Sequence, residues 1–110
     1  METPQETRRR TILIVEDDTA LARLVQWHLE EAGFDTMTAH TGKGALLRAA
    51  EKRPDLIILD LKLPDMHGYD VSKEFRKLYH PWAVPILMLT GMDKPIDQLR
   101  GFAFGADAYL

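Results

Sequence analysis

The sequence contains no cysteine, which excludes a disulfide framework and a thiolate metal site. It has no apolar run approaching the roughly 20 residues that a membrane-spanning helix needs, and no signal peptide is visible. An excess of basic residues is missing too. The formal net charge is -3, so direct nucleic-acid binding by this segment is not expected. Together these absences favour a cytoplasmic protein with no membrane association.

Length and composition indicate one globular domain. The 110 residues suffice for one modest core, and 45% hydrophobic and 28% charged residues is an ordinary globular composition. Residues 1–10 are polar and are predicted to form a disordered leader, in which Arg8-Arg9-Arg10 is interpreted as a solvated basic flank. The folded domain is expected over residues 11–110.

Apolar runs and helical periodicities alternate along the chain. Strands are predicted at about 11–15, 34–39, 56–59 and 85–89, with a fifth beginning at 108; helices are predicted at about 19–32, 41–52, 69–78 and 96–103. This strict alternation with short links predicts an α/β fold, a doubly wound parallel sheet with right-handed crossovers.

Helical spacing also predicts which side chains of each helix face the core. The predicted inward residues are Leu21, Leu24, Val25, His28, Leu29 and Ala32, then Leu46, Leu47 and Ala50, then Val71, Phe75 and Leu78, and finally Ile96, Leu99 and Ala103. His28 is therefore interpreted as a packed core histidine, and Trp27 as partly covered packing.

Acidic residues follow the two most apolar strands. The run 56–59 is predicted to be buried on both faces, and Asp60 comes directly after it. Glu16-Asp17-Asp18 follows the other strongly apolar run, 12–15. Parallel strands of one sheet end at the same edge, where open α/β sheets bind their ligands, so these carboxylates are expected to meet.

Clustered carboxylates raise one another's pKa unless a cation neutralises them, and Mg²⁺ bound by oxygens is the simplest solution. Asp carboxylates are known covalent acceptors of phosphoryl groups, and a hydroxyl at Thr90 could hydrogen-bond the phosphoryl oxygens. A single Asp after a strand is more often a helix cap, and Asp18 is expected to serve partly as one. Carboxylate placement alone also leaves metal-dependent hydrolysis open.

Four motifs resemble the receiver domain of bacterial two-component response regulators, over about residues 11–110. They are ILIVEDD at 12–18, LDLKLPDMHG at 59–68, MLTG at 88–91 and GADAYL at 105–110. The resemblance implies a flavodoxin-like sheet of five parallel strands in the order 2-1-3-4-5. It also implies a signalling domain rather than an enzyme, one that assists only its own phosphorylation and dephosphorylation.

The same resemblance implies roles for single residues. Asp60 would be the phospho-acceptor and Mg²⁺ the cofactor, with Asp60, Asp17, Glu16 through water, and the backbone carbonyl of Lys62 as the metal ligands. Thr90 would be the hydroxyl that binds the phosphoryl group and switches, and Tyr109 the aromatic residue that changes rotamer with it. The implied partners are a histidine kinase or phosphotransfer protein as donor, and an output domain or downstream protein as target.

The family also places a lysine and a proline just beyond the fifth strand, followed by a fifth helix. This sequence ends two positions before that lysine, so the domain is expected to be incomplete at its C-terminus, with the last helix missing. Such a chain is expected to be marginally stable or to associate, for instance as a dimer through the fifth-strand edge.

Two alternative functions stay open. One is an interaction-only pseudo-receiver; the other is a Mg²⁺-dependent phosphohydrolase of the haloacid dehalogenase type, although Lys62 stands where those enzymes have a second Asp.

Overall fold

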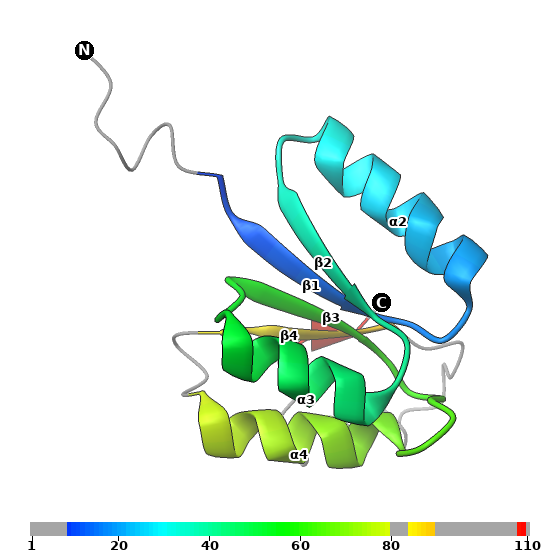
Figure 1. The fold of residues 1–110 in the computed structure, drawn as a ribbon, viewed down its shortest axis with the longest axis vertical. Helices are drawn as coiled ribbons and strands as arrows, with labels where there is room; N and C mark the ends of the chain where they lie inside the picture. Colours follow the sequence, from blue (N-terminus) through cyan, green and yellow to red (C-terminus); the bar gives the residue numbers. More distant parts are fainter. Residues whose placement is uncertain (1–8, 80–83, 90–107, 110) are drawn as a thin grey trace.

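The computed structural model describes residues 9–79, 84–89 and 108–109. Its elements in chain order are β1 (Thr11–Val15), α2 (Thr19–Glu31), β2 (Asp35–Ala39), α3 (Gly42–Glu51), β3 (Leu56–Asp60), α4 (Gly68–Leu78), β4 (Ile86–Leu89) and β5 (Ala108–Tyr109). The strands pair in parallel in one sheet of order β2-β1-β3-β4-β5 (Figure 1). The predicted α/β fold class and strand order are therefore confirmed. The predicted helix at 96–103 lies outside the described residues.

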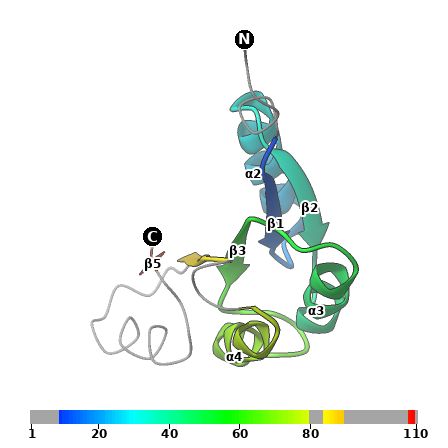
Figure 2. The ribbon, with the colours of Figure 1, turned by 90° about the vertical axis from the view of Figure 1, so that its left-hand side faces the viewer.

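The helices lie on both faces of the sheet, with α2 on one face and α3 and α4 on the other (Figures 1 and 2). Alternate residues of β1 serve the two faces: Leu13 and Val15 belong to the larger core with α3 and α4. Ile12 and Ile14 belong to the smaller core, against which Val25 and Leu29 of α2 pack. Burial on both faces explains why the central strands are almost wholly apolar.

Local signals set the ends of α2. The Asp18 carboxylate accepts hydrogen bonds from the Ala20 and Leu21 backbone N–H groups at 3.0 and 3.1 Å, which confirms Asp18 as the cap. After the helix, Gly33 has a φ of 98°, a left-handed conformation that glycine adopts without steric cost.

Among the described residues, no helix has both the length and the apolar composition needed to cross a bilayer.

Several predicted inward side chains instead face solvent, so those predictions were wrong. In α2 the buried residue is Ala22, and Val25 and Leu29 pack against the core as predicted. Leu21, Leu24 and His28 are exposed, Leu24 by 53%, and so is Ala32 just after the helix. In α3 Ala45 and Ala49 are buried, whereas Leu47 is 64% exposed and Ala50 is also exposed. In α4 Val71 and Phe75 are buried as predicted, but Leu78 is 50% exposed.

The physical reason is that the contact stripe of α2 and α3 contains small residues. Alanine lets a helix axis approach the sheet closely. Leu21, one position before Ala22, is then turned by about 100° from the contact, and Leu47, two positions after Ala45, by about 200°. From the spacing of apolar residues alone, a helix that packs through its alanines cannot be distinguished from one that packs through its leucines. Here Ala22 is the buried residue of α2, and Ala45 and Ala49 of α3 belong to the core that includes Leu13 and Val15 of the sheet.

Candidate functional site

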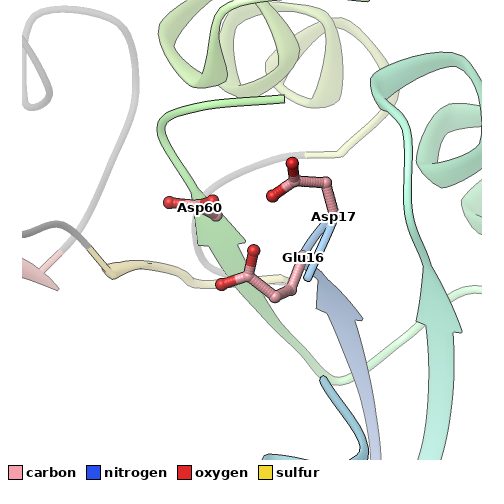
Figure 3. A group of neighbouring side chains, drawn as sticks. All are labelled: Glu16, Asp17 and Asp60. Carbon is pink, nitrogen blue, oxygen red and sulfur yellow. The ribbon is translucent and has the colours of Figure 1, made fainter. Parts of the chain in front are cut away.

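The ends of β1 and β3 bring three acidic residues together. These strands are neighbours, and their register pairs Val15 with Leu59, so the next residues, Glu16 and Asp60, come at the same edge. Oxygen atoms from Glu16, Asp17 and Asp60 all lie within 4.8 Å of one another. Figure 3 shows the three carboxylates pointing toward a common space beyond the two strands. We refer to these three residues as the acidic cluster.

Burial differs sharply within the acidic cluster. The Glu16 residue is only 7% exposed, Asp60 is partly exposed and Asp17 is exposed. Burial, the largest cause, and the neighbouring Asp60 and Asp17 carboxyls together raise the pKa of Glu16 from 4.5 to about 7. The Asp18 N–H, which donates to Glu16 Oε2 at 3.2 Å, acts in the opposite direction. Without a cation, Glu16 therefore holds a proton in part at neutral pH.

Backbone contacts hold the Glu16 segment in place. Its N–H donates to the Ala39 carbonyl at the end of β2 at 3.0 Å, and its carbonyl lies 2.8 Å from Nδ1 of His40. Asp18 is occupied with capping α2, so the two neighbouring aspartates have different tasks. Asp18 caps the helix, whereas the carboxylate of Asp17 lies near those of Glu16 and Asp60 (Figure 3).

A tight loop fixes the position of Asp60. The Gly68 N–H at the start of α4 donates to the Leu61 carbonyl at 2.7 Å, and Lys62 and His67 form an antiparallel bridge. A Cβ atom at Gly68 would lie 2.6 Å from the Asp60 carbonyl oxygen and 2.7 Å from Leu61 Cα. Only glycine fits this approach, which the sequence indicated solely as a loop-forming Gly after Pro64.

The other predicted site residues have different outcomes. Lys62 lies two residues after Asp60, exposed and in the backbone bridge to His67. Tyr109 belongs to β5, where its backbone pairs with Met88, and its side chain is outside the described part of the chain. Thr90 also lies outside the described residues.

The donor set of the acidic cluster fits a hard divalent cation. Its donors are carboxylate oxygens, the ligands that Mg²⁺ and Ca²⁺ prefer over nitrogen or sulfur. The cluster is open on the Asp17 side, which leaves room for water or an incoming phosphoryl oxygen at such an ion. The raised pKa of Glu16 is consistent with such a site. A bound cation would offset the repulsion between the carboxylates and so would lower the pKa of Glu16.

Comparisons with known proteins agree with this geometry. The family model described as the response regulator receiver domain matches residues 12–110. The chain is 41% identical over 101 residues to the alkaline phosphatase synthesis transcriptional regulatory protein PhoP of Bacillus subtilis, covering 92% of this chain and 41% of that protein. It is 42% identical over 105 residues to the DNA-binding response regulator MtrA of Mycobacterium tuberculosis, covering 96% of this chain and 45% of that protein. The chain thus spans less than half the length of these two relatives.

A solved structure of similar fold is that of the chemotaxis protein CheY4 of Vibrio cholerae. The two chains superpose with a TM-score of 0.88 at 34% sequence identity, over 94% of this chain and 86% of that one. A response regulator receiver domain from Methanospirillum hungatei gives a TM-score of 0.86 at 32% identity, over 94% of this chain and 81% of that one.

Proposed function

This chain belongs to the response regulator receiver domain family, and on that premise we propose that it accepts a phosphoryl group on Asp60. The observation that carries the proposal is the convergence of Glu16, Asp17 and Asp60 within 4.8 Å at the carboxyl ends of β1 and β3. A carboxylate nucleophile needs an access route and a nearby positive charge, and this edge of the sheet offers room for both.

In the proposed transfer, an Asp60 carboxylate oxygen attacks the phosphorus of a phosphohistidine on a partner protein. The new bond joins that oxygen to phosphorus, the phosphorus–nitrogen bond breaks, and the imidazole leaves with the electron pair. Mg²⁺, when bound, would neutralise the carboxylates and the phosphoryl oxygens. The residues that would hold it are Asp17 and Asp60 directly, Glu16 through water, and Lys62 through its backbone carbonyl.

The switch and the partners form a further part of the proposal. Thr90 would hydrogen-bond the phosphoryl group, and Tyr109 would change rotamer with it, so that phosphorylation biases a two-state equilibrium. The donor would be a histidine kinase or a phosphotransfer protein, and the target an output domain or downstream protein. Two relatives are named as a transcriptional regulatory protein and a DNA-binding response regulator, which supports an output of that kind. DNA contacts would then be made outside this segment.

The test is phosphorylation by a small acyl phosphate in the presence of Mg²⁺, followed by intact mass measurement. The parent chain should gain one phosphoryl group that hydroxylamine removes, as expected of an acyl phosphate, and Asp60→Asn should gain none. Asp70→Asn is the matched control, because Asp70 is an exposed aspartate in the first turn of α4. Equal labelling of Asp60→Asn and the parent would refute the assignment.

The same phosphorylation experiment distinguishes the proposed function from that of a pseudo-receiver. An interaction-only pseudo-receiver would take up no phosphoryl group, even though its carboxylates are present, and would bind its partner equally with and without the donor. The family match does not support a haloacid dehalogenase-type phosphohydrolase, since receiver domains are signalling domains.

A further inference from the structure

Asp65 ties the loop between β3 and α4 to the start of α3. One of its carboxylate oxygens accepts a hydrogen bond from the Gly42 N–H at 2.7 Å, and the other accepts from the Lys43 N–H at 3.0 Å. These two N–H groups lower the pKa of Asp65, that of Lys43 most. The carboxylate is therefore ionised at neutral pH and satisfies two N–H groups that have no partner within the helix.

The start of α3 has a second, separate cap. Thr41 Oγ1 accepts a hydrogen bond from the Gly44 N–H at 2.9 Å. Thr41 belongs to the helix's own sequence, whereas Asp65 comes from a different loop, 22 and 23 residues away from its two donors. The helix therefore keeps a cap of its own if Asp65 is removed, and what is lost is the tie to the loop.

Packing supports the same tie. A Cβ atom at Gly42 would lie 2.8 Å from Sδ of Met66, the neighbour of Asp65, and 2.9 Å from Cγ2 of Val71 in α4. The first turn of α3, the tip of the loop and the first turn of α4 are thus in direct contact. The Lys62–His67 bridge makes Lys62 part of the same short loop whose tip Asp65 ties to α3, and the Gly68 N–H bond to Leu61 closes that loop at its base.

We propose that Asp65 is a positioning residue for phosphoryl transfer. By fixing the tip of the β3–α4 loop to α3, it holds the backbone of Lys62 in its place two residues after Asp60. The inference rests on the proposed function, in which the Lys62 carbonyl is a metal ligand. Removing a group that is hydrogen-bonded to a metal ligand commonly changes metal affinity by about tenfold or more. Asp65 acts through the loop and not on Lys62 directly, so a loss of up to about tenfold is expected. Asp65 itself is exposed, so its removal costs little buried surface.

The experiment compares Asp65→Ala, Asp65→Asn and Thr41→Ala in the full chain. Amide hydrogen exchange without metal measures the loop directly: exchange at residues 62–67 should be several-fold faster in Asp65→Ala and unchanged in Thr41→Ala. Calorimetric titration with Mg²⁺ alone should show a weaker affinity in Asp65→Ala, by up to about tenfold. Asp65→Asn, which keeps one acceptor oxygen, should lie between that variant and the parent, and Thr41→Ala should match the parent.

Unchanged loop exchange in Asp65→Ala would overturn the anchoring. Faster exchange with an unchanged Mg²⁺ affinity would overturn the positioning role. An equal loss of affinity in Thr41→Ala would also overturn it, because the effect would then come from the stability of α3. If the parent itself bound no Mg²⁺, the proposed function would fail, and the exchange measurement would still decide whether Asp65 anchors the loop.

Discussion

Replacing Glu16 with Gln should stabilise the metal-free chain at neutral and higher pH. The side chain is almost fully buried beside two other carboxyls, and its pKa is raised from 4.5 to about 7. The folded chain therefore binds the Glu16 proton more tightly than the unfolded chain does. The stability that this proton contributes is fully present below about pH 4.5 and is lost as the pH rises through about 7. Gln keeps the shape of the protonated side chain and carries no charge at any pH.

The pKa difference sets the size of the effect. A rise from 4.5 to about 7 corresponds to a ceiling of about 3 kcal/mol, approached above pH 8. Asp17, whose carboxyl also raises the pKa of Glu16, is exposed to water, which weakens its contribution. The expected advantage of Glu16→Gln over the parent is therefore about 1–3 kcal/mol at pH 8, falling close to zero near pH 5.

Urea unfolding of parent and variant from pH 5 to pH 8.5, without divalent cations, measures this difference directly. Glu51→Gln is the matched control, because Glu51 is an exposed glutamate at the end of α3 and should show no such pH-dependent gain. Added Mg²⁺ should narrow the gap at pH 8, since it stabilises the ionised parent. A stability difference between Glu16→Gln and the parent that stays constant across the pH range would show that the Glu16 proton is not bound more tightly in the folded chain.

Three further predictions follow from single contacts. Asp17→Asn should weaken Mg²⁺ binding at least about tenfold in calorimetry, because one carboxylate of the acidic cluster is lost, and an unchanged affinity would remove Asp17 from the metal site. Gly68→Ala should lower the free energy of unfolding by about 1–3 kcal/mol in denaturant melts, because its Cβ would lie 2.6 Å from the Asp60 carbonyl oxygen; a parent-like midpoint would contradict this. Ser72→Ala should leave stability unchanged or raise it by about 1 kcal/mol, since the buried Ser72 hydroxyl has no hydrogen-bond partner among the described residues. A clear thermal destabilisation of Ser72→Ala would show that the hydroxyl does make a hydrogen bond in solution.

Features that depend on neighbours in the chain could be predicted from the sequence. The strands β1 and β3 are apolar runs bounded by charged or turn residues, and their observed limits match the predicted ones closely. Asp18 was recognisable as a cap because capping is a contact over two or three residues. The inward faces of α2 and α3 could be predicted only in part. Val25, Leu29 and Leu46 pack against the core as predicted, but leucine and alanine are both apolar and only the packed sheet selects between them at the other positions.

The meeting of Glu16, Asp17 and Asp60 could be predicted from the sequence, because the carboxyl ends of neighbouring parallel strands lie at one edge of the sheet. The functional roles of Lys62, Thr90 and Tyr109 rest on the family resemblance and stay proposals. The folded structure was needed to establish how strongly Glu16 is buried, how closely Gly68 approaches Asp60, and that Asp65 reaches the start of α3. Each of these depends on distances between segments far apart in the chain, which the packing of helices on the sheet sets and local sequence patterns do not encode.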